Sequence, residues 1–160
     1  MSIRYEIRVC ALLALSGLLA LCGIGLCDVV INELELSPPD NGTVWVEIYN
    51  TADASVDLTG WMINIRDGAW QGVIILNVSI EPGAFLAVDG SDSWVTSGNG
   101  TVYLYDDSGI EMDRTPQLGD DSHTDFSYGR FPDGARTDTR ADFAYMMASK
   151  GRPNGSGALN

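Results

Sequence analysis

Cysteine is scarce in this sequence, and the few copies lie together at one end. The 160-residue chain has three cysteines, Cys10, Cys22 and Cys27, and none follows residue 27. A domain built from residues 28–160 therefore has no disulfide, no thiol nucleophile and no thiolate ligand for a metal. Its stability must come from the burial of apolar side chains, which a chain of this length can supply.

Basic residues and histidine are also few. Nine lysines and arginines stand against 22 aspartates and glutamates, for a net charge of −13. Because such a surface repels phosphate groups, we expect no nucleic-acid partner. The one histidine, His123, follows Ser122, but adjacent side chains do not easily face each other, and no nucleophile-elbow motif is present. We interpret His123 as a solvated loop residue and predict that the protein is not an enzyme.

Residues 1–27 differ in kind from the rest. Arg4 and Arg8 precede an apolar run over residues 9–26, and this order is typical of an export signal. Small residues near the end of the run favour cleavage before Asp28. The run is also just long enough to cross a bilayer, so an uncleaved signal anchor is the alternative. Both place the remaining chain outside the cytoplasm, because the positive end stays inside. We expect a secreted or cell-surface protein that touches the membrane only through this segment, if it is uncleaved.

Sustained helical periodicity is absent, and short apolar alternations separated by turn residues replace it. The clearest alternation begins at residue 44, and a second apolar stretch starts at residue 58. We predict that these two strands form the centre of a β-sandwich whose core includes Val46, Ile48, Leu58, Trp61 and Ile63. Further strands are predicted at 28–36, 73–76, 78–80, 84–88, 101–105, 110–112, 126–131 and 141–147, with turns at Asp67-Gly68, Glu81-Pro82-Gly83 and Asp106–Gly109. Many short strands with frequent turns indicate a sandwich or barrel.

Several stretches of the chain follow the order of a known family. They are VVINELEL at 29–36, WVEIYN at 45–50, VDLTGWMI at 56–63, IEPGAFLAV at 80–88, TVYLYDDSG at 101–109, DFSYGRFPDG at 125–134 and SKGRPN at 149–154. The chain resembles the lamin tail domain, a small immunoglobulin-like β-sandwich. The resemblance implies one all-β domain over residues 28–154, followed by a short tail at 155–160.

The resemblance carries no catalytic residues over to this chain. The sequence also has no coiled coil, no basic nuclear-targeting run and no prenylation cysteine at its C-terminus, so the nuclear role of lamins is not implied. We predict an exported, non-enzymatic binding or structural module of the cell envelope. Two alternatives stay open. One is a calcium-dependent accessory module to, or degenerate form of, a secreted hydrolase, and the other is a signal-anchored envelope scaffold.

Aspartates are numerous in the second half of the chain. Carboxylate oxygens are ligands for Ca²⁺, but no calcium-loop spacing occurs, and aspartate is common in turns. We interpret the candidates as turn residues and expect no cofactor, with a structural Ca²⁺ as the alternative. These candidates are Asp106, Asp107, Asp113, Asp120, Asp121 and Asp125.

Aromatic residues are the candidate binding anchors. They can form an exposed face for a protein or a neutral glycan of the cell surface, or they can pack across neighbouring strands. The candidates are Trp45, Tyr49, Trp70, Trp94, Tyr103 and Tyr105. Glu47, Ser127 and Arg130 also lie on predicted strands, and we expect them to pair locally or to face water.

Four glycosylation sequons occur, and three of them have the sequence Asn-Gly-Ser/Thr, which is also typical of turns. We expect all four on the surface, whether or not they carry glycan. The asparagines are Asn41, Asn77, Asn99 and Asn154.

Overall fold

The computed structural model describes residues 29–39 and 42–155. The predicted signal or anchor segment at 1–27, the sequon residue Asn41 and nearly all of the predicted tail lie outside the described residues.

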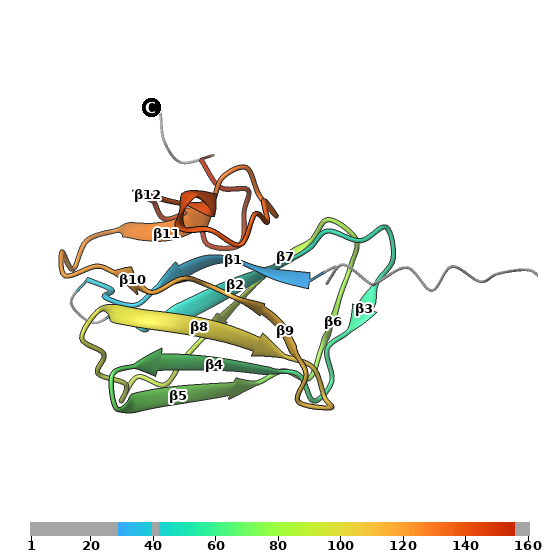
Figure 1. The fold of residues 1–160 in the computed structure, drawn as a ribbon, viewed down its shortest axis with the longest axis horizontal. Coiled ribbons are helices and arrows are strands. Elements are labelled where there is room, and N and C mark those ends of the chain that lie inside the picture. The colour runs from blue at the N-terminus through green and yellow to red at the C-terminus, as the bar shows by residue number, and fades with distance from the viewer. Residues whose placement is uncertain (1–28, 40–41, 156–160) are drawn as a thin grey trace, which may run out of the picture.

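Two antiparallel sheets pack against each other, as Figure 1 shows. The first has the order β12-β11-β1-β2-β7, formed by Phe143–Met147, Phe126–Arg130, Val29–Glu35, Trp45–Asn50 and Phe85–Asp89. The second has the order β10-β8-β4-β5, formed by Leu118–Gly119, Asn99–Tyr105, Met62–Asp67 and Trp70–Ile75, and β9 (Glu111–Arg114) also pairs with β8. β3 (Val56–Asp57) pairs with β6 (Ser79–Ile80), and a 3₁₀ turn, η1, spans Arg140–Asp142. The predicted all-β, immunoglobulin-like sandwich is confirmed.

Local turn chemistry explains the hairpins. The Asp-Gly pair at 67–68 joins β4 to β5, where Asp67 lies opposite Trp70 and Gly68 has a φ of +58° that favours glycine. In the hairpin between β8 and β9, the Asp106 carboxylate accepts hydrogen bonds from the backbone N–H groups of Ser108 and Ile110, at 3.0 and 2.7 Å. Side-chain bonds of this kind replace backbone bonds in a turn, so short polar sequences are enough to fix where these strands end.

The core lies between the two sheets and takes its side chains from both. Val46, Ile48, Leu58 and Ile63 have no exposed surface. Trp61 was also expected in the core, and this expectation is wrong, because Trp61 is only partly buried and packs against the margin of the cluster. The backbone N–H of Trp61 donates to the Leu58 carbonyl at 2.9 Å. This tight turn carries Leu58 inward and leaves the indole at the edge.

The different burial of Leu58 and Trp61 gives a test of the core. Leu58→Ala should lower the free energy of unfolding by about 2–5 kcal/mol, because it opens a cavity in a closed core. Trp61→Ala should lower the free energy of unfolding by less than the removal of a fully buried aromatic side chain does, because part of the indole is already in water. Urea denaturation of the two variants measures both. A larger loss for Trp61→Ala than for Leu58→Ala would contradict this placement.

Candidate functional site

The outer face of β1 and β2 carries buried carboxylates, and the C-terminal segment covers them. We call residues 149–154 the C-terminal latch. Glu33 is fully buried and accepts hydrogen bonds from the backbone N–H and hydroxyl of Ser149, at 2.8 and 2.9 Å. Glu47, also fully buried, accepts from the N–H of Gly151, and the Asn154 amide donates to the carbonyl of Arg130 at 2.9 Å. The latch is therefore held by hydrogen bonds to two buried carboxyl groups and to a backbone carbonyl.

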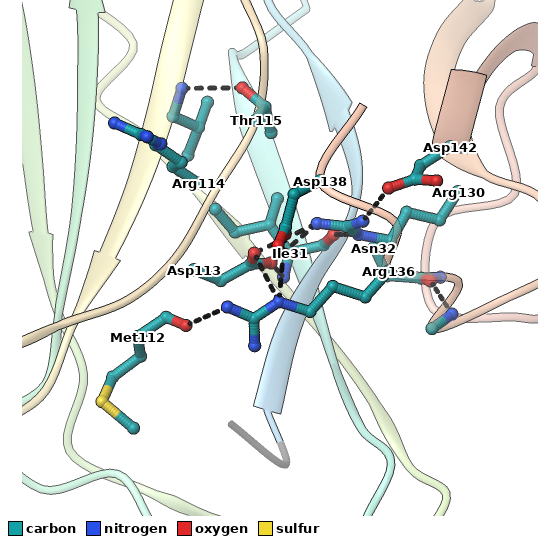
Figure 2. A network of polar contacts seen from close by, with 12 residues as sticks. Ile31, Asn32, Met112, Asp113, Arg114, Thr115, Arg130, Arg136, Asp138 and Asp142 are labelled. Carbon is teal, nitrogen blue, oxygen red and sulfur yellow. Dashed lines mark hydrogen bonds and ion pairs between the residues drawn. The ribbon is translucent and has the colours of Figure 1, made fainter. Parts of the chain in front are cut away.

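A second buried network surrounds Arg130, and Figure 2 shows it. Arg130 is 1% exposed, and its Nη2 donates to both carboxylate oxygens of Asp113, at 3.1 and 2.9 Å. Nη1 reaches Asp142 at 3.2 Å, and Nε donates to the carbonyl of Ile31 at 2.7 Å. One guanidinium thus joins β11 to β9 of the second sheet, to η1 and to β1.

The two aspartates of this network have different environments. Burial raises the pKa of Asp113 above its ordinary value, although Arg130 and the backbone N–H of Ile31 act in the opposite direction. Burial alone would also raise the pKa of Asp142, but hydrogen bonds from Thr137 and the charge of Arg130 hold it below its ordinary value. A cavity of about 280 Å³ borders the network. The charged groups of the network are paired with one another. The arrangement links the two sheets through paired charges and can hold the fold together.

A third polar site lies where β1 ends. Glu35 is 3% exposed, and its Oε1 accepts the backbone N–H of Ser37 at 2.7 Å. Its Oε2 has no hydrogen-bond partner among the described residues, and the same holds for Oδ2 of buried Asp120. Burial raises the pKa of Glu35 to about 7; the Ser37 N–H opposes this shift, and the charges of Asp120, Glu33 and Asp125 add to it.

Glu35 lines an open hollow of about 330 Å³. We call this pocket the Glu35 hollow; its walls include Thr43, Trp45, Asp89, Asp125 and Lys150. Lys150 forms an ion pair with Asp89, and its Nζ lies 5.4 Å from the centroid of the Trp45 ring. The hollow therefore combines a buried acceptor, two further carboxylates and one ammonium group that is already paired.

The aromatic candidates mostly have packing partners. Trp70 and Trp94 meet edge to face at 5.4 Å and pack against the core. Trp45, one of the candidate binding anchors, is only 6% exposed, so of the two alternatives packing applies to it; the latch residue Lys150 lies over its ring. The tyrosines are half-buried, with Tyr49 stacked on Phe85 at 4.5 Å and Tyr103 stacked near Tyr105 at 6.1 Å.

The six candidate aspartates are dispersed rather than gathered. Asp106 is a turn residue, whereas Asp113 is buried in the Arg130 network, so the turn interpretation is wrong for it. Asp120 is buried, and its Oδ1 accepts from the backbone and hydroxyl of Ser122. The other three, Asp107, Asp121 and Asp125, are exposed. In the described part of the chain, no three histidine, cysteine, aspartate or glutamate side chains are placed to hold a metal ion together.

The sequon asparagines differ in exposure. Asn77 and Asn99 are exposed. Asn154 is only 7% exposed, so the prediction that it lies on the surface is wrong. Its amide oxygen accepts from the Ser149 hydroxyl, and its Nδ2 donates to backbone carbonyls, which leaves no room for a glycan.

One polar pair was missed by sequence reasoning. The Ser37 hydroxyl lies 3.1 Å from Nδ1 of His123, while Ser122 bonds to Asp120 instead. Ser37 and His123 are 86 positions apart in the sequence, and no motif around either residue predicts that they meet. Among the described residues, no carboxylate bonds to His123, so the orienting acid of a catalytic triad is not in place.

The comparisons with known proteins agree with this architecture. The model of the Lamin Tail Domain family matches residues 26–118. No curated protein matches the chain. The match ends in β10, so β11 and β12, which complete the first sheet, and the latch that follows them lie beyond it in the sequence. Within residues 29–39 and 42–155, no helix is long and apolar enough to cross a membrane.

Proposed function

Because this chain belongs to the lamin tail domain family, we propose that it acts by binding, without turnover, as a module outside the cytoplasm. The match covers more than half of the chain, and the family is one of binding and structural immunoglobulin-like domains rather than of enzymes.

The proposal that the protein binds without turnover rests on the hydrogen-bond partners of its buried polar side chains. Catalysis by acid–base or nucleophilic routes needs a side chain that is free to exchange a proton or to attack. In the described residues the buried side chains of Glu33 and Glu47 are instead bonded to the latch, and that of Arg130 is bonded to Asp113 and to backbone carbonyls. The exception is Glu35, whose Oε2 has no hydrogen-bond partner among the described residues, but this oxygen is buried and closed to solvent.

The sequence of the N-terminal segment supports the compartment. A basic start followed by the apolar run at 9–26 is typical of an export signal. The net charge of −13 disfavours anionic polymers as partners, which leaves a protein or a neutral glycan of the cell surface.

The proposal predicts binding to envelope material and no turnover. Purified protein incubated with envelope fractions of the native host should show saturable retention that unlabelled protein competes away at moderate salt. Nuclease, esterase and glycosidase substrates should remain intact. The protein isolated from that host should lie outside the cytoplasm and, if cleaved, should begin at or near Asp28 by intact mass.

Three results would count against this function. Turnover that one carboxylate substitution abolishes would show an enzyme. Recovery from the cytoplasm would contradict the compartment. The absence of both retention and turnover would favour a scaffold. A heat-unfolded sample serves as the control for nonspecific retention.

A further inference from the structure

Strand β5 forms an open edge of the second sheet, at the end of the order β10-β8-β4-β5 (Figure 1). The backbone N–H of Leu76 donates to the carbonyl of Trp61 at 2.8 Å, and in an antiparallel pair the bonded residues alternate from there along the strand. The backbone N–H and carbonyl groups of Gln71, Val73 and Ile75 therefore point away from β4. Such a row of open backbone groups can pair with a strand of another molecule.

The usual protections of an open edge are missing from β5. Native edge strands commonly carry charged residues, proline or a bulge. No charged residue and no proline occurs between Asp67 and Glu81, and the pairing of β4 with β5 keeps one register along its whole length. The side chains of Val73, Ile75 and Val78 are 43%, 63% and 43% exposed. An uncharged apolar edge of this kind is prone to pair with a second copy of the chain unless it is covered.

A glycosylation sequon lies at the end of this edge, at residues 77–79. Residues 71, 73, 75 and 77 are exposed, whereas residues 72 and 76 are buried. Asn77 therefore continues the exposed face that carries Val73 and Ile75. Two residues of strand rise by about 7 Å, so a sugar chain on Asn77 would begin beside the exposed side chain of Ile75.

The structure distinguishes Asn77 from the other sequon asparagines. Asn154 is buried, and Asn41 lies outside the described residues. Asn99 is exposed, but it lies within β8 and packs against β10, where its amide oxygen is 2.3 Å from the position that a Cβ atom on Gly119 would take. A glycan on Asn99 would have to displace this contact.

The sequon at Asn77 also lacks the alternative explanation that applies to the other three. Those have the sequence Asn-Gly-Ser/Thr, which is typical of turns, whereas valine follows Asn77. Asn77 and Ser79 are both exposed, and their side chains have no hydrogen-bond partner among the described residues. The amide that would accept a sugar and the hydroxyl that completes the sequon are therefore both accessible.

We propose that Asn77 is a site of N-linked glycosylation and that its glycan covers the open edge of β5. The donor is an oligosaccharide joined through a phosphate or diphosphate to a membrane lipid. Nδ2 of Asn77 forms a bond to the anomeric carbon of the first sugar and loses one proton to a base of the transferase. The bond from that carbon to the phosphate oxygen breaks, and the lipid phosphate leaves with the electron pair. The inference rests on the proposed location outside the cytoplasm and adds a modification to the proposed function.

Mass spectrometry of the protein isolated from its native host tests the modification. Trypsin leaves Asn77 and Asn99 in one peptide, residues 67–114, because no lysine or arginine precedes the last residue of that range. Chymotrypsin separates the two asparagines by cleavage after Phe85 or Trp94. The chymotryptic peptide that contains Asn77 should carry added sugar mass, and the one that contains Asn99 should not.

Variants expressed in that host separate the glycan from the asparagine side chain. Asn77→Gln and Ser79→Ala should both lose the sugar mass, since each destroys the sequon, whereas Ser79→Thr keeps the sequon and should retain it.

Sedimentation velocity at equal protein concentrations tests the covering role. Asn77→Gln and Ser79→Ala should self-associate more than the native protein, because the edge of β5 is then open. Asn99→Gln and Ser79→Thr are the matched controls and should sediment as the native protein does. Adding Ile75→Lys to Asn77→Gln should reverse the association, because a charge on an edge strand opposes pairing.

The possible results distinguish the inference from the proposed function. Unmodified Asn77 in protein recovered outside the cytoplasm would overturn the inference and leave the proposed function standing, whereas recovery from the cytoplasm would count against both. Equal occupancy of Asn77 and Asn99 would contradict the selection of one sequon by the fold. A glycosylated Asn77 whose loss leaves sedimentation unchanged, or an association that Ile75→Lys does not reverse, would overturn the covering role.

Discussion

Arg130→Met should lower the free energy of unfolding by about 3–5 kcal/mol. The guanidinium is 1% exposed and is the partner of two buried carboxylates, Asp113 and Asp142. Methionine fills much of the volume, but it leaves Asp142 without its cation and Asp113 with only the longer ion pair to Arg136, at 3.7 Å. It also removes the donor to the Ile31 carbonyl. Against a total stability of about 5–15 kcal/mol, this loss would unfold a large share of the molecules at moderate temperature. Urea denaturation followed by tryptophan fluorescence measures it.

The control for Arg130→Met is a substitution of Arg114, an arginine on strand β9. Arg114 is exposed, and its one ion pair among the described residues is with Glu111, at 3.5 Å, so Arg114→Met should change stability by less than about 1 kcal/mol. A third variant that combines Arg130→Met with Asp113→Leu should recover part of the loss, because it removes one of the stranded charges. Equal effects of Arg130→Met and Arg114→Met would show that the buried network does not stabilise the fold.

The features that were predicted from sequence are those that local chemistry determines. The alternation in 44–49 and the turn at Asp67-Gly68 placed strands and a hairpin near their observed positions, because side-chain direction and backbone φ depend on adjacent residues. The two-residue strands β3 and β10 were not predicted, since so short a segment carries no periodicity.

The burial of charged residues could not be predicted in the same way. The second half of β1 carries three polar residues, Asn32, Glu33 and Glu35, and side chains of these types are mostly exposed, yet all seven residues of the strand are buried. The cause is the latch, in which Ser149 bonds to Glu33 across 116 positions of sequence. The SKGRPN stretch at 149–154 has a counterpart in the resemblance to the family, but its composition does not predict that it covers the carboxylates of Glu33 and Glu47. The same long-range packing explains why Asn154 is buried.

The Glu35 hollow was missed for a related reason. In the sequence, nothing distinguishes Glu35 from the other polar residues of its strand. Asp125 and Lys150, which line the hollow with it, lie about 90 and 115 positions further along the chain. Only the folded arrangement shows that one carboxylate oxygen faces no donor among the described residues.

Raising the pH from about 4.5 to about 7 should destabilise the protein, in contrast to the usual behaviour of carboxylates. Burial raises the pKa of Glu47 from 4.5 to about 7; the N–H of Gly151 and the amide of Asn32 oppose the shift, and nearby negative charges add to it. Glu35 has a similarly raised pKa of about 7. In this interval the unfolded chain has released both protons and the folded chain still holds them, so the free energy of unfolding falls as pH rises. Each group contributes about 3 kcal/mol to the fall.

Glutamine substitutions separate this effect from the general repulsion of an acidic surface. The stabilising contribution of each neutral carboxyl is fully present below about pH 4.5 and is lost as the pH passes 7. Glu35→Gln and Glu47→Gln cannot ionise, so each should flatten the pH profile of urea denaturation and should gain stability over the native protein at about pH 8. Glu81→Gln, on an exposed turn, should keep the native slope. A native profile that stays level or rises between these pH values would show that Glu35 and Glu47 are ionised in the fold throughout.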